Sequence, residues 1–247
     1  MASAASMGVA VRALMIVLLF VMVAAFANLF AVDGYISCFD FSARWGVKIL
    51  MEFSVYTVVM GAWFFYKESG WIKTIIFTLS MYFLGSLLSI GYILVQFFKL
   101  SREESSTNPL YFVLARHHTR EHTSRIPVVT VRAIFSALAF LTMGALIYTL
   151  IKDISGSYAD AFTKCFLANM IDLYIHAVMF AVWIAYKESS WIRASLWIIS
   201  LLFFGSITLC VYIVRQLFSI SPEKPASSII FSSSDICEPL LAPHANV

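Results

Sequence analysis

The stretch "FYKESGWIK" at residues 65–73 recurs almost unchanged as "AYKESSWIR" at residues 185–193, which is 120 residues later. Each copy is a short polar turn between two long apolar runs. When the chain is shifted by 120 residues against itself, residues 11–101 align with residues 131–221 without a gap, and 26 of the 91 positions are identical. Shared hydrophobicity alone does not keep such a register over three apolar runs, so the sequence indicates a duplicated unit.

The composition indicates a chain that lies in a lipid bilayer. Hydrophobic residues make up 61% of the 247 residues and charged residues 13%, whereas soluble domains have about 45–50% and about 25%. The net charge of +3 is too small to indicate a nucleic-acid partner. Six apolar runs are long enough to cross about 30 Å of hydrocarbon as helices. We place these runs at residues 11–32, 45–66, 71–98, 129–151, 164–186 and 191–218.

The predicted fold class is therefore all-α, with six transmembrane helices. Because each unit contains an odd number of spans, the second unit is expected to enter the membrane from the opposite side. That arrangement, two inverted three-helix repeats, is common among transporters. The predicted organisation is a first repeat at 1–101, a basic linker at 102–128, a second repeat at 129–221 and a disordered C-terminal tail at 222–247.

Two indications about orientation conflict. The positive-inside rule places the basic linker in the cytoplasm, with ten basic residues inside and seven outside. The tail contains Leu240-Leu241 after an acidic residue and resembles a dileucine sorting signal, which sorting machinery reads from the cytosol. With inverted repeats the linker and the tail lie on opposite sides, so the orientation and the membrane, endomembrane or plasma membrane, stay open. The same arrangement separates Cys38 from Cys165, so no disulfide is expected between them.

Two acidic residues occupy equivalent positions inside predicted spans. Glu52 and Asp172 align under the 120-residue shift, and each lies about 10 Å into its span. An ionisable group at that depth costs at least about 2.5 kcal/mol and marks a candidate functional site. Lys48 stands one helical turn before Glu52, whereas Ala168 takes its place in the second unit and His176 follows Asp172 by one turn. Since Asp172 lacks a close cation, we expect it to adopt the neutral form more readily.

Other polar residues extend this candidate binding site. Gln96 and Gln216 are equivalent in the two units, and we predict that they line the same interior. The alternative for the glutamines is hydrogen bonding between helices. The alternative for the two acids is structural pairing within a packed bundle.

The repeated turn is expected at the membrane surface. Tyr and Trp prefer the interface, and a neighbouring Lys can extend to the lipid headgroups. Interface anchoring therefore accounts for the residue types, and selective binding by the Lys-Glu pair is the alternative. The residues of this motif are Tyr66, Lys67, Glu68, Trp71, Tyr186, Lys187, Glu188 and Trp191.

No motif predicts an enzyme. "HTREH" at 118–122 matches the H-x-x-E-H pattern of one protease class, but no segment of the linker offers a third zinc ligand. We interpret it as a solvated basic loop. The chain contains neither a phosphate-binding loop nor a dinucleotide fingerprint, so we expect no catalytic residue, no metal site and no cofactor.

The block "ANMIDLYIHAVMFAVWIAYKESSWIR" at 168–193, followed by "FGS" at 204–206, resembles small bacterial three-span membrane proteins of unknown function. The whole chain resembles a plant family of uncharacterised membrane proteins of about 250 residues. The first unit departs from the block, since Ile49 replaces Asn169 and Glu52 replaces Asp172. The resemblance implies duplication of a three-helix unit and names no substrate.

Two classes of function follow. The first is a small transporter or channel for a small solute or ion, in which Glu52 and Asp172 line a path between the repeats and protonation shifts the packing. The second is a non-catalytic membrane protein that binds or escorts partners through its linker and tail. A water-filled cavity that reaches both acids would favour the first class, and a dry bundle would favour the second.

Overall fold

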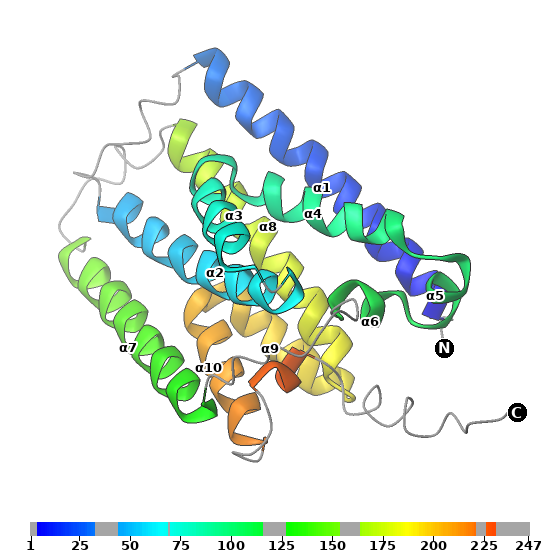
Figure 1. Ribbon diagram of the computed structural model, residues 1–247. Coiled ribbons are helices and arrows are strands. Elements are labelled where there is room, and N and C mark those ends of the chain that lie inside the picture. Colours follow the sequence, from blue (N-terminus) through cyan, green and yellow to red (C-terminus); the bar gives the residue numbers. More distant parts are fainter. Residues whose placement is uncertain are drawn as a thin grey trace, which may run out of the picture.

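The structure is a computed structural model that describes residues 4–32, 44–68, 70–115, 127–153, 164–220 and 226–230. These residues are almost entirely helical, which confirms the all-α prediction for this part of the chain (Figure 1). The elements are α1 (Ala4–Val32), α2 (Arg44–Glu68), α3 (Trp71–Leu84), α4 (Ser86–Lys99), α5 (Arg102–Thr107), α6 (Pro109–Leu114), α7 (Val128–Asp153), α8 (Lys164–Lys187), α9 (Trp191–Phe204), α10 (Ser206–Phe218) and the 3-10 helix η3 (Ala226–Ile230).

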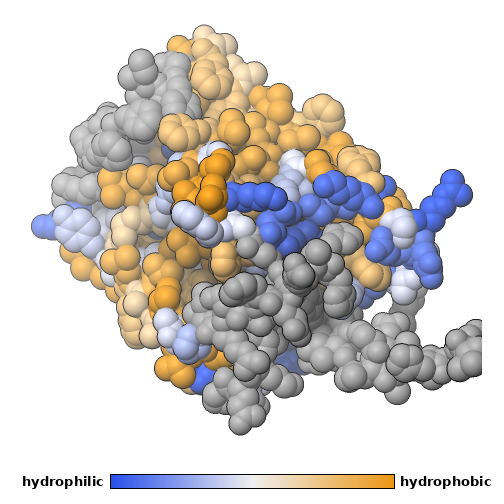
Figure 2. Space-filling model, in the orientation of Figure 1, coloured by the Kyte–Doolittle hydropathy of each residue, from blue (hydrophilic) through white to orange (hydrophobic). Residues whose placement is uncertain are grey.

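Four of the six predicted spans are long, continuous helices. Among the described residues, four segments are long and apolar enough to cross a membrane. They lie in α1, α2, α7 and α8 and cover Ser6–Val32, Trp45–Glu68, Val128–Lys152 and Cys165–Lys187. Large apolar side chains are exposed along the bundle, with Phe140 on α7 being 80% exposed, and apolar residues cover much of the surface in Figure 2. An apolar surface of this extent is unusual for a soluble monomer.

The predicted spans at 71–98 and 191–218 are not continuous helices, which corrects the six-span prediction. Each is a hairpin of two shorter helices, which we call the first hairpin (α3–α4) and the second hairpin (α9–α10). The rings of Phe77 and Tyr92 lie 5.7 Å apart, although fifteen residues of continuous helix would separate them by about 22 Å. In the second hairpin the rings of Trp197 and Tyr212 lie 5.2 Å apart. The two arms of each hairpin therefore fold back against each other.

A single glycine makes each bend. Gly85 has φ 54° and ψ −139°, and Gly205 has φ 55° and ψ −127°. Residues with a side chain rarely adopt these angles, whereas glycine does so at little cost. Each arm has 13 or 14 residues and is about 20 Å long, which is too short to cross 30 Å of hydrocarbon. An isolated glycine inside an apolar run does not by itself predict a break, so the sequence did not reveal the hairpins.

Helices α2 and α8 begin at the same end of the bundle, which we call the Cys165 end. Leu29, near the end of α1, packs with Cys165 and Ala168 at the start of α8. Ile49, near the start of α2, lines the same cavity as Ala168. The two helices then run side by side in the same direction (Figure 1).

Both copies of the repeated turn consequently lie at the opposite end, which we call the YKES end. Tyr56 of α2 stacks on His176 of α8 with centroids 6.1 Å apart, and these two positions are equivalent under the 120-residue shift. The inverted arrangement is therefore wrong for these helices. Each hairpin returns to the end from which it started, so each unit has two long helices rather than three. Because two is an even number of crossings, the second unit starts at the same end as the first and runs in the same direction.

Equivalent helices make equivalent contacts in the two units. Helix α1 packs against α4 of its own unit and α8 of the other, while α7 packs against α10 of its own unit and α2 of the other. At the YKES end, α6 lies against Gly8 near the start of α1, and its Val113 carbonyl accepts a hydrogen bond from Lys67 at the end of α2. This packing brings the bend of each hairpin to the interior of the bundle, against the other unit.

Candidate functional site

Asp172 of the second unit holds the bend of the first hairpin. Its Oδ1 accepts a hydrogen bond of 2.6 Å from the backbone N–H of Ser86, the first residue of α4. The first N–H groups of a helix have no partner within the helix and carry the positive end of its dipole, so a carboxylate is stabilised there. A Cβ atom at Gly85 would lie 2.6 and 2.7 Å from the two carboxylate oxygens. Only glycine therefore admits Asp172, which is 6% exposed.

Glu52 of the first unit occupies the corresponding place at the second hairpin. A Cβ atom at Gly205 would lie 2.8 Å from its Oε2, and Glu52 is 4% exposed. Lys48 Nζ lies 2.8 Å from Glu52 Oε1, one helical turn away on the same face of α2. The described residues contain no hydrogen bond between Ser206 and Glu52, so the two bends differ in how they are held.

Each of the two acids therefore contacts the hairpin of the other unit. Each carboxylate faces the bend of the other unit's hairpin. Glu52 has a cation and Asp172 has the start of a helix, so the predicted asymmetry between them is present in the structure.

His176 lies beside Asp172, as predicted, and is fully buried. Its Nδ1 is 3.0 Å from the backbone oxygen of Asp172 and its Nε2 is 3.4 Å from Ser89 Oγ. Because a carbonyl oxygen only accepts, Nδ1 carries a proton, and Nε2 shares a hydrogen bond with the Ser89 hydroxyl. His176 Nδ1 lies 3.9 Å from Asp172 Oδ1, too far for a direct hydrogen bond.

Several buried hydroxyl groups have no hydrogen-bond partner among the described residues. They belong to Ser86, Ser206, Tyr56 and Thr57. The two serines are equivalent, and each is the first residue after its bend. Buried polar groups are rarely unsatisfied, so these hydroxyls mark places for water or for a bound group.

A cavity of about 70 Å³ adjoins Asp172 near the Cys165 end. Its lining comes from α1, α2, the first hairpin and α8, and it contains Asp172 but not Glu52. The lining residues are Met22, Phe26, Leu29, Ile49, Leu50, Phe53, Met81, Tyr82, Phe83, Gly85, Ala168, Asn169 and Asp172.

The glutamines do not join the acids, which corrects the prediction that they line the same interior. Gln96 and Gln216 each lie ten residues beyond the first residue of their hairpin arm, about 15 Å along the helix towards the YKES end. Gln216 Nε2 instead donates to Glu188 Oε1 at 3.2 Å. Gln96 is buried at the equivalent place in the first unit.

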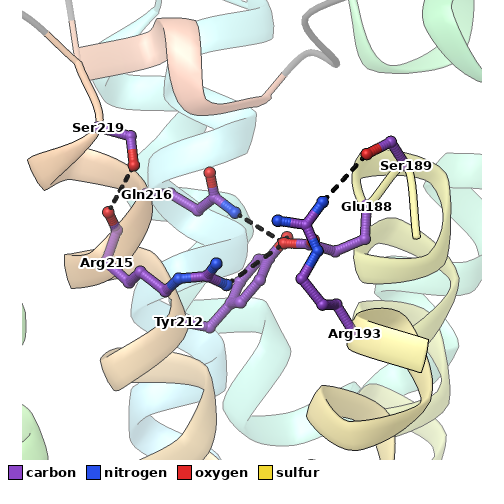
Figure 3. Close-up of polar contacts among 7 residues, drawn as sticks. All are labelled: Glu188, Ser189, Arg193, Tyr212, Arg215, Gln216 and Ser219. Carbon is purple, nitrogen blue, oxygen red and sulfur yellow. Dashed lines mark hydrogen bonds and ion pairs between the residues drawn. The ribbon is translucent and has the colours of Figure 1, made fainter. Parts of the chain in front are cut away.

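Glu188 of the repeated turn is the centre of a polar cluster that ties the turn to the second arm of its own hairpin (Figure 3). It accepts from the Tyr212 hydroxyl at 3.2 Å and forms ion pairs of 3.6 Å with Arg193 and Arg215. Glu68 in the first unit accepts from the Tyr92 hydroxyl at 2.6 Å. Each pair is separated by 24 residues, so the identical glutamates and tyrosines of the two units have one shared structural role.

The remaining residues of the motif divide into buried and exposed sets. Trp71 and Trp191 are 66% and 83% exposed, as expected of interface anchors, and Tyr66, Tyr186 and Lys187 are half-buried. Lys67 is buried and donates to the carbonyl oxygens of Val113 and Ala115. The prediction that this lysine extends to lipid headgroups is therefore wrong, because the end of α6 supplies acceptors for it.

Two arginines bind the C-terminal ends of the second hairpin arms, α4 and α10. The sequence alone did not reveal this role for either arginine. Arg12 donates to the carbonyl oxygen of Phe97 at 3.0 Å, and Arg132 donates to that of Leu217 at 2.7 Å. Cations are favoured at helix C-termini, where carbonyl groups lack partners. The identical "VRA" at 11–13 and 131–133, each at the edge of an apolar run, was the available signal.

Some predictions fall on parts of the chain that the structure does not describe. The histidines of "HTREH" at 118–122 and Leu240-Leu241 lie outside the described residues. Within the described ranges, no group of three His, Cys, Asp or Glu residues is arranged to hold a metal ion.

Comparison with known proteins gives one family. No curated protein and no solved structure matches the chain. The model of the family described as "Protein of unknown function (DUF1475)" matches residues 1–236, which include both units and the linker. The chain therefore belongs to this family of unknown function.

Proposed function

We propose that the chain is a multi-pass membrane protein that moves a proton or a small cation across the bilayer, with Asp172 as the binding group. The observation that carries this proposal is a buried carboxylate at the bend of a broken helix. Discontinuous helices whose ends point at ions or charged groups form the binding sites of many transporters. Ionisable side chains at such depth are costly and are kept for function.

The charge distribution supports one orientation. Of the 13 lysines and arginines within the described ranges, four lie at the Cys165 end and the other nine lie at the YKES end. The positive-inside rule therefore favours a cytoplasmic YKES end. The four exceptions are Arg44, Lys48, Lys152 and Lys164.

The cysteines support the same orientation. Cys165 is disulfide-bonded, and disulfides persist in oxidising compartments. The Cys165 end would then face the lumen or the exterior. The sequence predicted no Cys38–Cys165 disulfide, because inverted repeats would place the two residues on opposite sides. That reason no longer holds, since α2 and α8 begin at the same end. The linker and the dileucine-like tail both become cytoplasmic, which removes the conflict between them.

Single-cysteine labelling tests this topology. In a background without native cysteines, Lys73→Cys and Arg193→Cys replace exposed residues next to the two YKES turns, and Val32→Cys replaces an exposed residue at the other end. We expect a membrane-impermeant maleimide to label the first two variants only in vesicles with the cytoplasmic side outward, and the third only in the opposite orientation. Labelling of Lys73→Cys and Arg193→Cys from opposite sides would restore the inverted arrangement.

Protonation of Asp172 supplies the conformational step. The ionised carboxylate accepts a charge-assisted hydrogen bond from Ser86, which is about twice as strong as the bond to a neutral acid. A difference of about 1 kcal/mol changes a two-state population about five-fold. A proton on Asp172 would therefore loosen the first hairpin. Glu52, which is paired with Lys48, would keep the second hairpin fixed.

A flux assay tests the proposed function. The full chain is reconstituted in liposomes that contain a pH-sensitive dye, and a potassium diffusion potential drives proton uptake. We expect uptake at least ten times that of protein-free liposomes, and uptake by Asp172→Asn at the protein-free level. Glu103→Gln, which changes an exposed acid on α5, should leave uptake unchanged.

Two results would count against the proposal. Uptake by the wild-type chain at the protein-free level would favour the partner-binding class instead. Equal uptake by Asp172→Asn and the wild type would remove Asp172 from the path.

A further inference from the structure

We infer that the cavity beside Asp172 binds a small alkylammonium ion, with the positive nitrogen at Asp172 Oδ2. This inference rests on the proposed function and names the class of substrate for the same site. It follows from the charge of the cavity, the chemistry of its walls and its size, which are independent observations.

The charge of the cavity calls for a cation. Asp172 Oδ1 accepts a hydrogen bond from the backbone N–H of Ser86, and the described residues donate no hydrogen bond to Oδ2. The side chain is 8% exposed and borders the cavity, whose lining contains no lysine, arginine or histidine. His176 is fully buried and is not part of the cavity lining, and its ring nitrogens contact the backbone oxygen of Asp172 and the hydroxyl of Ser89. A buried carboxylate oxygen without a partner is satisfied by a donor that brings positive charge.

The walls favour an organic cation over a metal ion. Four aromatic residues line the cavity, namely Phe26, Phe53, Tyr82 and Phe83, and aromatic faces attract ammonium groups. Calcium takes six to eight oxygen ligands and magnesium requires an octahedron of them. The side chains of the lining offer the carboxylate of Asp172, the amide of Asn169 and the hydroxyl of Tyr82, a set too small for either ion.

The volume limits the size of the ligand. The cavity of about 70 Å³ is roughly half of the 150 Å³ that holds benzene, with its six heavy atoms, in an engineered protein. About three heavy atoms therefore fit, as in ethylammonium. Tetraethylammonium, with nine heavy atoms, does not fit.

The site also explains how the cation and the proton would be coupled. Both compete for the carboxylate of Asp172, so a proton that binds there displaces the alkylammonium ion, and the ion displaces the proton. One positive charge leaves for each one that arrives, and the site stays neutral. We therefore expect ethylammonium to inhibit the proton uptake that depends on Asp172.

Binding to the purified full chain in detergent micelles tests this inference without requiring transport. In isothermal titration calorimetry we expect ethylammonium to bind, while ethanol, which has the same size without the charge, and tetraethylammonium do not. Asp172→Asn should weaken ethylammonium binding at least ten-fold. Ala168→Val, which adds two methyl groups to the cavity wall, should weaken it while keeping the carboxylate. Circular dichroism and thermal melts of both variants report whether they fold.

The outcomes separate the two proposals. Proton uptake that depends on Asp172, together with no ethylammonium binding by the wild type, overturns the alkylammonium site and leaves the proposed function standing. Ethylammonium binding that both variants weaken supports the site even if no flux is found. Equal binding of ethylammonium by the wild type and by folded Asp172→Asn overturns the inference.

Discussion

Gly85→Ala is expected to destabilise the folded chain by about 2.5–6 kcal/mol. The backbone at Gly85 has φ 54°, and a residue with a side chain in such a conformation costs about 1–3 kcal/mol. The new Cβ would also lie 2.6 Å from Asp172 Oδ1, so the carboxylate must leave Ser86, and a hydrogen bond to a charged group contributes about 1.5–3 kcal/mol. Since native proteins are stable by about 5–15 kcal/mol, much of the stability is lost.

The chain provides matched controls for this substitution. Gly91 in α4 and Gly144 in α7 are helical glycines in apolar runs, and a Cβ at either position would meet no atom within 4 Å. Gly91→Ala and Gly144→Ala should therefore be neutral or stabilising by up to about 1 kcal/mol. Thermal melts and denaturant unfolding in one detergent would compare the variants.

Gly205→Ala should resemble Gly85→Ala, because a Cβ there would lie 2.8 Å from Glu52 Oε2. A Gly85→Ala chain as stable as Gly91→Ala would mean that α3 and α4 form one continuous helix. The hairpins and the parallel direction of the two units would then both be wrong.

Glu188→Ala is expected to destabilise the chain by about 2–4 kcal/mol. Glu188 accepts from the Tyr212 hydroxyl and the Gln216 amide, and its side chain is 6% exposed. Without it the hydroxyl of Tyr212, a fully buried residue, lacks an acceptor, and an unsatisfied buried group costs about 1–3 kcal/mol. Arg193 and Arg215 are about half exposed and can turn to solvent, so their ion pairs add little.

The equivalent position in the first unit gives a graded comparison. Glu68 accepts from the Tyr92 hydroxyl and is more exposed than Glu188, so water can replace part of the contact. We expect Glu68→Ala to cost about 1–2 kcal/mol. Glu103→Ala on the surface of α5 should change stability by no more than about 0.5 kcal/mol. If Glu188→Ala behaves like Glu103→Ala in the same unfolding assay, the cluster in Figure 3 does not hold the hairpin.

The pattern of apolar and polar residues along the chain was sufficient to predict much of the architecture. The long apolar runs predicted α1, α2, α7 and α8, because length and hydrophobicity along the chain determine whether a helix can be long and apolar. The 120-residue register identified the two units and paired Glu52 with Asp172. Helical spacing also placed Lys48 next to Glu52 and His176 next to Asp172, since residues four apart share one face of a helix.

Contacts between distant segments decided the rest. Within an apolar run, Gly85 is compatible with a straight helix and with a bend, and only the carboxylate of Asp172, 87 residues away, gives the bend a partner. The bend then sets the number of long helices in each unit, and through it the direction of the second unit. The same dependence explains why Gln216 joined Glu188 rather than the acids. The sequence alone determined which residues are costly to bury in an apolar run, because that cost is local. Only the tertiary structure decided what satisfies them, because their partners come from the other unit or from the other arm of a hairpin.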